Sequence, residues 1–374
     1  MTLSQLIMSN NGGKVTLDKD YEESIKILSS YSVTLDLAGH RLSNSDDEYT
    51  ITNMGSLTLM DSVGGGVIYN SASKKGCLVN LNRGNVTIKD GVAFEMNNPR
   101  PNKDAWYYIA NMGALMVIED AVVEGTAPNA STIRNGFYTE SNDDGHTCAM
   151  VINGGRFGGE LIPVKNDSYG ILTINGGSFI SPNECVLAWN KCSITGGTFK
   201  TTNNFVVFSG AYTDRGCDGG LSITGGTFEG TKGIIKDLTE SYAPEKVHSA
   251  KIGVSGGSFN MEVPKDYLPS GIEMSLVDGK YVFNKVGWDV TEFSPGGGFA
   301  NMKRCVLHAS KLNYVAGGFP IPAIGFTPIA IMGCNAVGGV TAYYDPESRK
   351  VLLYTNGSEA SGSIKDLTVV LIGY

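Results

Sequence analysis

The sequence predicts an all-β protein: a right-handed parallel β-helix of about nine coils, followed by a small antiparallel β-sandwich. Three observations carry this prediction. A short apolar strand followed by Gly-Gly-x-Phe occurs five times, at residues 152–157, 174–179, 194–199, 223–228 and 254–259. Strands with the same alternation recur upstream of this array, without the double glycine. Beyond about residue 286 the phrase is absent, and longer alternating segments take its place.

The repeated phrase has the spacing of a solenoid. Its first glycines stand at positions 154, 176, 196, 225 and 256, which are 20 to 31 residues apart. Self-similarity at such a period indicates stacked units that each borrow their core from their neighbours. The phrase is too short for a helix, and its β-branched and aromatic residues flank glycines that permit a sharp bend or a positive φ. We therefore expect one strand, one Gly-Gly corner and one inward Phe in each coil.

One apolar strand position can be assigned to every coil. Alternation of period two, which a half-buried strand requires, marks anchors at residues 35, 59, 88, 118, 152, 174, 194, 223 and 254, about 27 residues apart on average. Where successive anchors are only about 20 residues apart, the coil has room for three short strands and tight corners and for no long loop. Steps near 30 residues imply longer loops from one corner, where a solenoid carries its binding surface. The candidate loops are residues 97–108, 126–147 and 212–219.

Both ends of a β-helix expose strand edges and need covers. Residues 1–30 are expected to form the N-terminal cap, and residues 31–285 the β-helix. Thr2 can cap a helix of one to two turns, and apolar residues at positions 3, 6 and 7 favour its packing as a plug. A mobile terminus is the alternative. Residues 280–285 look like the final strand.

Residues 286–374 are expected to form a β-sandwich that serves in docking or oligomerisation. The alternating segments in this part show no helical period; they lie at residues 304–308, 329–332, 340–344, 351–354 and 367–372. Residues 343–354 predict a β-hairpin, because Asp345-Pro346 opens a turn between two apolar runs. The sequence ends on a strand, and a terminus inside a sheet is normally held in place.

Charge and composition argue against several classes of function. The net charge is −8, and residues 286–374 contain six basic and six acidic residues, so the predicted β-helix carries the whole negative excess. An acidic solenoid argues against nucleic-acid binding. The sequence has no run of 18 apolar residues that would predict a membrane span, and the first ten residues show no secretory signal. Seven cysteines without a pairing pattern predict reduced, mostly buried thiols, as in a protein assembled in cytoplasm.

Two motifs suggest chemistry, and each has a structural alternative. Residues 142–146 place Asp143 and Asp144 beside an imidazole, and glycoside hydrolysis needs paired carboxylates about 5 to 9 Å apart. Adjacent side chains point apart, so an enzyme would need a second carboxylate from the next coil, and the same residues form a common surface turn. Trp106, Tyr107 and Tyr108 offer aromatic faces on which a sugar ring could stack, or they pack a corner.

Metal and cofactor sites are not predicted. Residues 44–48 carry oxygen ligands that would suit calcium, but they lack the spaced acids of a calcium loop and are expected to form a solvated turn. In the calcium-binding β-roll repeat an Asp follows the glycines where this chain has Phe. The histidines have no ligand spacing with the cysteines, and no phosphate loop or nucleophile elbow is found in the sequence. We therefore expect no catalytic, cofactor-binding or metal-binding residues, and no enzyme activity.

Residues 33–42 resemble the entry phrase of pectate-lyase-like β-helices. The matching residues are Thr34, Leu35, Asp36, Leu37, Gly39, His40 and Leu42. The resemblance implies the β-helix fold and a superfamily that includes phage tailspikes. The lyase members use clustered aspartates for calcium and a basic catalytic residue, and neither can be placed in this sequence.

About the last 85 residues resemble the C-terminal module of tailed-phage virion proteins. The match lies in residues 312–321, 328–332, 342–354 and 366–373, which follow the order of the family's pattern up to the end of the chain. Ser363, Ile364 and Lys365 replace the usual Ala-Gly-Thr before the last Asp-Leu pair. Proteins with this module are head decoration, head-fibre or similar capsid-surface components, which is what the resemblance implies here.

Together these resemblances predict a phage virion surface protein, assembled in the host cytoplasm, that decorates the capsid as a head fibre or decoration protein. Its expected partners are two sister chains in a homotrimer, by analogy with phage β-helices, and the major capsid protein or another virion protein. Binding of host or environmental glycans is a further expectation, whereas nucleic acid and membrane are not expected as partners. The alternatives are a tailspike that cleaves polysaccharide and a bacterial adhesin.

Overall fold

The chain forms two compact units. Unit 1 comprises residues 1–269 with 275–283, and unit 2 comprises residues 270–274 with 284–374. The computed structural model describes residues 1–71, 75–96, 107–125, 131–137, 142, 145–159, 161–212, 219–240, 247–248, 250–269, 273–277, 279–284, 289–293, 303–314, 319–320, 328–335, 340–345, 347, 350–355, 358–360 and 362–373. Each unit is considered separately below.

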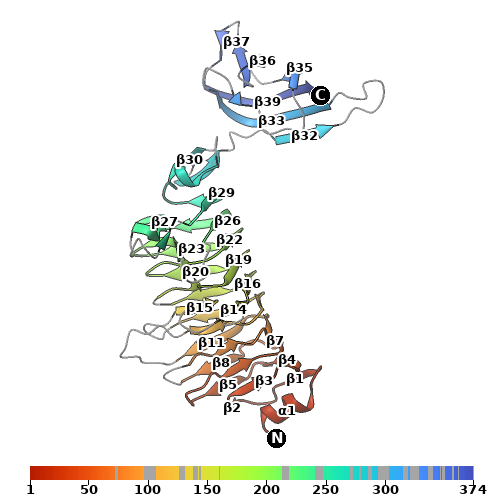
Figure 1. The fold of residues 1–374 in the computed structure, drawn as a ribbon, viewed down its shortest axis with the longest axis vertical. Coiled ribbons are helices and arrows are strands. Elements are labelled where there is room, and N and C mark those ends of the chain that lie inside the picture. The colour runs from red at the N-terminus through yellow and green to blue at the C-terminus, as the bar shows by residue number, and fades with distance from the viewer. Residues whose placement is uncertain are drawn as a thin grey trace. The chain divides into compact units, whose positions relative to one another are not determined.

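Unit 1 is a parallel β-helix with three faces, which confirms the predicted fold (Figure 1). The first face contains β1 (Lys14–Thr16), β4 (Ser32–Asp36), β7 (Ser56–Met60), β10 (Asn85–Ile88), β13 (Leu115–Ile118), β16 (Cys148–Ile152), β19 (Gly170–Ile174) and β22 (Cys192–Ile194). The second face contains β2 (Tyr21–Glu22), β5 (Arg41–Asn44), β8 (Val67–Asn70), β11 (Val92–Met96), β14 (Ala121–Glu124), β17 (Arg156–Gly158), β20 (Ser178–Ser181) and β23 (Thr198–Thr201). Two longer strands, β26 (Leu221–Glu229) and β29 (Ile252–Phe259), run over both of these faces.

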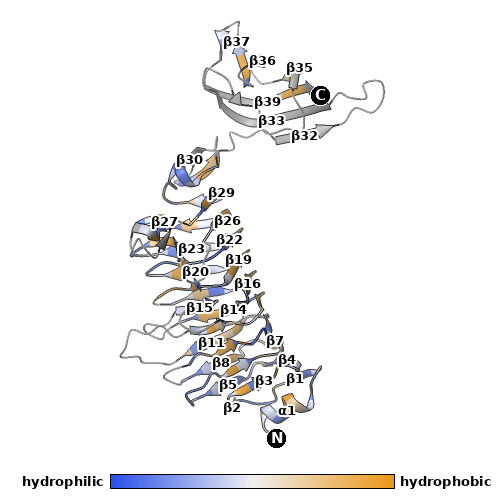
Figure 2. Cartoon of the chain, in the orientation of Figure 1, coloured by the Kyte–Doolittle hydropathy of each residue, from blue (hydrophilic) through white to orange (hydrophobic). Residues whose placement is uncertain are grey.

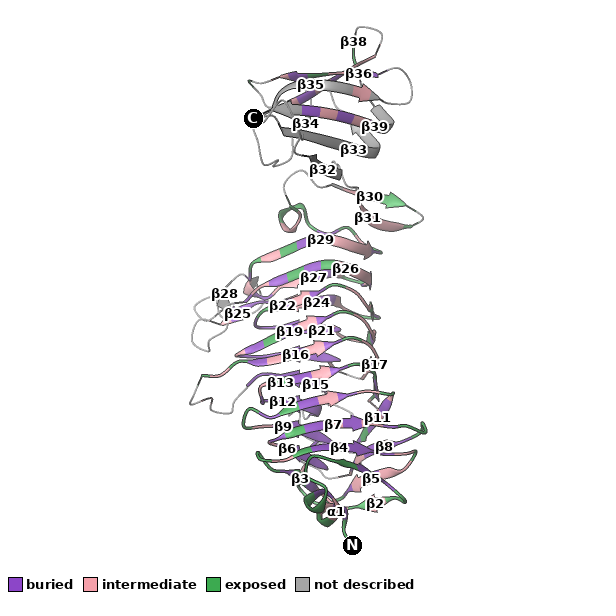
Figure 3. Ribbon diagram, turned by 90° about the vertical axis from the view of Figure 1, so that its right-hand side faces the viewer, coloured by how far each residue is buried: buried purple, intermediate pink, exposed green. Residues whose placement is uncertain are grey.

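The third face is a separate sheet of nine strands within the described residues, so the stack has nine three-sided coils and begins a tenth with β29. Its strands are β3 (Ile25–Ile27), β6 (Ile51–Asn53), β9 (Leu78–Asn80), β12 (Tyr107–Asn111), β15 (Ser131–Asn135), β18 (Val164–Asn166), β21 (Val186–Ala188), β24 (Phe205–Ser209) and β27 (Gly233–Asp237). Buried and outward residues alternate along most strands of the first two faces, as Figures 2 and 3 show by hydropathy and burial.

All nine predicted anchor residues lie in one column of the first face. The column runs from Leu35 through Leu59, Ile88, Ile118, Ile152, Ile174, Ile194 and Ile223 to Val254. Val15 pairs with Leu35 in the same register, so the β-helix already begins at Lys14 rather than at residue 31. The capping segment is therefore confined to residues 1–13.

The capping segment contains one short helix, α1 (Leu3–Ser9). Thr2 caps it as predicted: its hydroxyl accepts a hydrogen bond from Gln5 N, and the Gln5 side chain accepts one from Thr2 N. Leu3 and Ile7 are buried, and α1 packs beside β3. This helix is too short to span a membrane, and no other described helix is long and apolar enough to do so.

The Gly-Gly-x-Phe phrase forms a corner, and each of its two glycines is needed there for a different physical reason. At Gly197 the backbone adopts φ +102°, a conformation that L side chains rarely take. At Gly196 a Cβ atom would collide with the carbonyl oxygen of Asn175 in the preceding coil. The following Phe199 is fully buried. The first glycine thus permits close stacking of corners, and the second permits the bend.

The five phenylalanines of the phrase form a continuous stack inside the second face. The rings belong to Phe157, Phe179, Phe199, Phe228 and Phe259, and successive ring centroids lie 4.7 to 5.1 Å apart. This separation matches the spacing of neighbouring strands, about 4.8 Å. The stack ends at Phe283, which meets Phe259 edge to face at 6.0 Å.

The parallel stack ends where β31 (Lys280–Asn284) pairs antiparallel with β29. This strand is the one that the sequence predicted at residues 280–285. The remaining elements of this region are β30 (Glu273–Val277) and the short helix η2 (Lys265–Tyr267). Because an antiparallel strand reverses the chain direction, the coil that β29 starts is not continued.

A ladder of asparagines, which sequence reasoning missed, joins five successive coils inside the third face. Its members are Asn53, Asn80, Asn111, Asn135 and Asn166, all with no exposed surface. Each amide donates a hydrogen bond to the amide oxygen of the next member, at 2.7 to 2.9 Å. The same amides also donate to backbone carbonyls of the corners. A buried polar column is thereby satisfied along its whole length.

The longer connections between described strands fall at two corners of the β-helix, whereas the sequence predicted longer loops at one corner. Some connect the second face to the third, between Met96 and Tyr107 and between Glu124 and Ser131. Others connect the third face back to the first, between Asn135 and Cys148 and between Ser209 and Leu221. The last of these carries β25 (Ala211–Tyr212), which pairs with β28 (Val247–His248), and η1 (Leu238–Glu240) lies near β28. Residues 126–147 are not a single loop, because β15 lies within them.

The cysteines agree with the prediction of buried thiols where their side chains are described. Cys77, Cys185 and Cys192 are buried free thiols, Cys148 is buried and Cys334 is half-buried. Burial raises the pKa of Cys185 and of Cys192 to about 12, and it raises the pKa of Cys77 as well. Such thiols stay protonated at neutral pH and are unreactive. The Cys217 and Cys305 side chains lie outside the described residues.

Unit 2 is antiparallel, as predicted, and contains two sheets within the described residues. One sheet has the order β32 (Asp289–Phe293), β33 (Lys303–Tyr314), β39 (Gly362–Gly373) and β35 (Pro328–Asn335). The other joins β34 (Phe319–Pro320), β37 (Lys350–Thr355) and β36 (Val340–Asp345), with β38 (Ser358–Glu359) on β37. The predicted hairpin is β36–β37, and the final strand β39 is bonded on both sides. Alternate residues of β37 and β39 are buried, as packed sheets require.

The asparagine ladder supplies the first testable prediction. Replacing Asn111 by Ala removes its hydrogen bonds with Asn80 and Asn135 and leaves an amide oxygen of Asn135 without a donor in a dry interior. We expect a loss of at least about 2 kcal/mol in the free energy of unfolding, measured by urea denaturation. Asn175→Ala is the matched control, because Asn175 belongs to an exposed ladder with Asn153 and Thr195 and should cost much less. Equal losses in the two variants would contradict the ladder's role.

Candidate functional site

Of the residues that sequence analysis singled out, Tyr107 and Tyr108 lie in β12 of the third face. A layer of apolar side chains packs on the outside of this sheet in two clusters. One cluster contains Val79, Tyr107, Ala110, Met112, Phe137 and Cys148, and the other contains Leu187, Trp189 and Leu238. These clusters cover the outer side of the sheet at β9, β12 and β21.

Between the two clusters lies a group of buried charged residues that sequence reasoning did not find. Arg134 and Lys165 occupy neighbouring outward positions of β15 and β18, and they are only 4% and 8% exposed. The Lys165 Nζ lies 3.3 Å from Asp167 Oδ1 and 3.4 Å from the Tyr107 hydroxyl. The Arg134 guanidinium lies over the Tyr107 ring at 4.8 Å. Burying charge is costly unless it is paired, so this group serves packing and offers no open surface to a substrate.

The predicted sugar platform is not available at the residues that the structure describes. Tyr107 and Tyr108 are 5% and 1% exposed, so neither ring can stack on a sugar, and the corner-packing alternative applies to both. Trp106 lies outside the described residues, as do Asp143 and Asp144. Of their neighbours, Asn142 donates a hydrogen bond to the backbone oxygen of His146, and the His146 ring packs edge-on against Phe137 at 5.4 Å.

The acidic segment at residues 44–48 is a turn held by its own asparagine. The Asn44 side chain donates to the carbonyl oxygens of Asp46 and Glu48 and accepts from Asp46 N. The side chains of Asp46, Asp47 and Glu48 are exposed. Over the described part of the chain, no group of three or more His, Cys, Asp or Glu side chains is placed to hold a metal ion.

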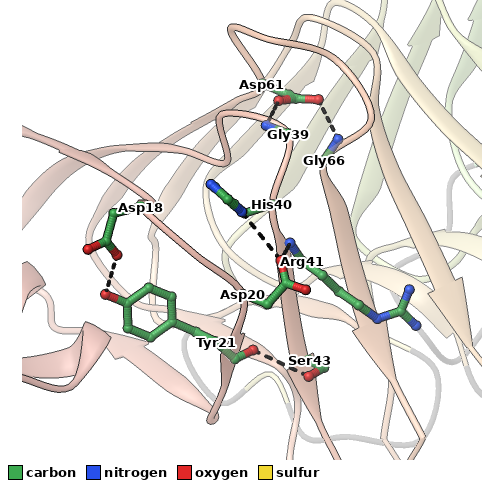
Figure 4. A network of polar contacts seen from close by, with 9 residues as sticks. All are labelled: Asp18, Asp20, Tyr21, Gly39, His40, Arg41, Ser43, Asp61 and Gly66. Atoms are coloured by element: carbon green, nitrogen blue, oxygen red, sulfur yellow. Dashed lines mark hydrogen bonds and ion pairs between the residues drawn. The ribbon is translucent and has the colours of Figure 1, made fainter.

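The corner between the first and second faces carries a network of carboxylates, drawn in Figure 4. Asp61 accepts hydrogen bonds from the backbone nitrogens of Gly39 and Gly66, at 2.7 and 2.6 Å. Asp20 accepts one from Arg41 N at 2.9 Å and lies 3.4 Å from the His40 Nδ1. Asp61 thus ties its coil to the preceding one, and Asp20 ties its coil to the following one. Three residues of the network, Gly39, His40 and Arg41, belong to residues 33–42.

Asp36 is the most deeply buried carboxylate of this corner. Burial alone would raise its pKa, but the ion pair with Lys14 at 2.7 Å and hydrogen bonds from Ser62 and Ala38 outweigh burial. The balance holds the pKa of Asp36 at about 2. The ionised side chain consequently stabilises the first three coils.

The second face carries a shallow groove of about 470 Å³. Its charged residues are Glu124 and Arg156, which form an ion pair at 3.2 Å, and the exposed Ile180 borders it. Glu184 follows the groove residues Ser181 and Pro182 in sequence. Burial raises the pKa of Glu184, although an amide hydrogen bond from Asn204 at 3.3 Å opposes that effect.

Comparisons of this chain with protein-family models, with curated proteins and with solved structures found no match.

The pKa of Asp36 predicts an acid-sensitive N-terminal region. Because the folded pKa lies below the unfolded value of about 3.9, the stabilisation is present above pH 4 and is lost as the pH falls towards 2. We expect Asp36→Asn to lower the free energy of unfolding at pH 7 by up to about 2 kcal/mol and to flatten its pH dependence between pH 4 and 2. Urea denaturation across this range measures both effects.

Lys14→Ala should raise the midpoint of the acid transition, since it removes the partner of Asp36. Lys26→Ala, at an exposed position of β3, is the control and should keep the wild-type profile. A wild-type profile in Asp36→Asn would contradict the assignment.

Proposed function

We propose that this chain is a structural component of a tailed-phage virion, exposed on the capsid surface as a head fibre or decoration protein, and that it is not an enzyme. The observation that carries the proposal is the use of polar groups in unit 1. The asparagine ladder and the corner carboxylates bind neighbouring coils to each other. A stack held in this way suits a rigid projecting element, and the resemblances of residues 33–42 and of about the last 85 residues point to phage proteins.

Unit 2 is proposed to attach the protein to the virion and to its sister chains. Its charge balance favours this role, because six basic and six acidic residues leave residues 286–374 neutral while the rest of the chain is acidic. The final strand β39 is bonded on both sides, so the end of the sequence is part of the sheet. A homotrimer is proposed, with the major capsid protein or another virion protein as the further partner. Unit 1 would then display glycan-binding surfaces to the environment.

The assembly can be tested by light scattering on the full chain and on a chain that ends at residue 284. We expect the full chain to have three times the single-chain mass of 39.7 kDa at micromolar concentration, and the shortened chain to be monomeric. A monomeric full chain would contradict the proposal. Antibodies against the full chain should label the capsids of the phage that encodes it, and labelling of the tail would favour the tailspike alternative.

Polysaccharide cleavage is the second candidate function, and one observation favours it. A general acid needs a raised pKa, and burial raises the pKa of Glu184, which follows Pro182 of the second-face groove by two positions in the sequence. A glycosidase also needs a second carboxylate about 5 to 9 Å away, and the groove's Glu124 is already ion-paired with Arg156.

Incubation with bacterial surface polysaccharides, followed by a reducing-end assay, tests this candidate. Under the structural proposal we expect no release of reducing ends. Release that disappears in Glu184→Gln, but persists in Glu229→Gln on the same face, would establish the enzyme instead.

A further inference from the structure

The second-face groove, with its volume of about 470 Å³, is built by successive coils in one register. Residues from two outward columns of this face line it. Arg156 and Ser178 are neighbours in the first column, and Glu124, Gly158 and Ile180 follow one another in the second. The strand pairing therefore fixes where each of these residues stands in the groove.

Gly158 leaves an opening between Glu124 and Ile180. It stands between them in the second column and contributes no side chain, and two strand spacings place the backbones of its two neighbours roughly 10 Å apart. Among the described residues, a Cβ atom built on Gly158 would meet only the backbone oxygen of Ile180, at the ordinary contact distance of 3.6 Å. The floor of the groove is backbone at this point, and the space above it is open.

An ion pair beside this opening keeps hydrogen-bonding groups that it does not use. Glu124 Oε1 and Arg156 Nε lie 3.2 Å apart, and both side chains are 64% exposed. Within the described part of the chain neither side chain makes another hydrogen bond or ion pair. A guanidinium group has five N–H donors and a carboxylate has two acceptor oxygens. The terminal N–H groups of Arg156 and the Oε2 atom of Glu124 are thus available to a ligand.

Hydroxyl groups and an apolar surface complete the groove. Ser178, which is next to Arg156 in its column, and the exposed Thr202 offer hydroxyls that both donate and accept hydrogen bonds. Ile180 is 54% exposed and lines the groove together with the half-buried Pro182. A few convergent polar groups beside apolar surface, in a volume between about 300 and 1,000 Å³, are typical of small-molecule sites.

The ion pair favours a neutral ligand. An anion would have to compete with Glu124 for Arg156, and a cation would have to compete with Arg156 for Glu124. A sugar avoids this competition, because its hydroxyl groups can accept from Arg156 and donate to Glu124 while the pair stays intact. The C–H face of a sugar ring is apolar and suits the exposed surface of Ile180.

We propose that the second-face groove binds a neutral oligosaccharide. Arg156 donates to the hydroxyl groups of one sugar unit and Glu124 accepts from them, while the C–H face of the ring packs on Ile180 above the opening at Gly158. The inference rests on the proposed glycan-displaying role of unit 1, and it names both the site and the class of glycan.

Calorimetric titration of the full chain with four neutral tetrasaccharides tests the inference: maltotetraose, cellotetraose, mannotetraose and N-acetylchitotetraose. Tetragalacturonate is the acidic counterpart, and tetraethylene glycol is the neutral control without a sugar ring. We expect at least one neutral tetrasaccharide to bind at least tenfold more tightly than both of these compounds. Its affinity should be nearly equal at 50 and 200 mM salt, because salt screens interactions between charges and the ligand carries none.

A matched pair of double variants locates the binding. Glu124→Ala/Arg156→Ala removes the ion pair of the groove without a change of net charge and should lower the affinity at least tenfold. Arg41→Ala/Glu95→Ala removes another exposed ion pair of 3.2 Å from the same face, outside the groove, and should bind as wild type.

A second pair of variants tests the opening itself. Gly158→Leu fills it with an apolar side chain and should abolish binding. Gly253→Leu places the same side chain on an exposed outward glycine of β29, where the described residues leave the Cβ position without a neighbour within 4 Å, and should bind as wild type. Urea denaturation of both variants checks that they are folded.

The outcomes separate the inference from the proposed function. No binding of any neutral tetrasaccharide, equal binding of tetragalacturonate or tetraethylene glycol, or unchanged binding in Glu124→Ala/Arg156→Ala would overturn the neutral-glycan site. A trimer that is found on capsids would keep the proposed function in all three cases. Binding that vanishes in the groove variants of a monomeric chain absent from capsids would keep the site and overturn the virion role.

Discussion

The distance of about 4.8 Å between neighbouring strands is the constraint on which the whole β-helix depends. Each coil repeats the path of the one before it, so a side chain meets its equivalent directly above and below. An inward position therefore favours residues that pack well against copies of themselves. Isoleucine, phenylalanine and asparagine meet this condition in three ways, by branched packing, by ring stacking and by amide-to-amide hydrogen bonds. Charged residues do not, because like charges on opposed strand positions repel.

Two of these columns divide the stack between them. The asparagine ladder holds coils two to six on the third face, and the phenylalanine stack holds the second face from coil six onward. They overlap in the coil that contains both Phe157 and Asn166. The ladder stops there because the next position is Ala188, and Asn166 donates instead to the carbonyl oxygens of Gly170 and Lys191. Corner carboxylates such as Asp61 add to the first coils, where no phenylalanine stack exists.

Much of the fold could be predicted because the anchors and the Gly-Gly phrase are local patterns. The ladder was missed because insertions vary its spacing, although the phrase Asn-Met-Gly at residues 53–55 and 111–113 was a usable signal. The buried Arg134 and Lys165 were unpredictable, since their burial comes from segments packed outside the sheet. The hairpin β36–β37 followed from Asp345-Pro346, whereas the place of β39 between β33 and β35 depends on long-range pairing.

The way the stack ends has a consequence for the behaviour of many copies together. A parallel array with an open edge offers unpaired N–H and C=O groups to any passing strand, which is how fibrils grow. Here α1 packs beside the first coil, and at the other end β31 runs against the direction of β29 while Phe283 turns its edge towards the last stacked ring. The repeating interactions that build the β-helix therefore stop within one molecule. The number of coils in the stack is thus set by the sequence of a single chain.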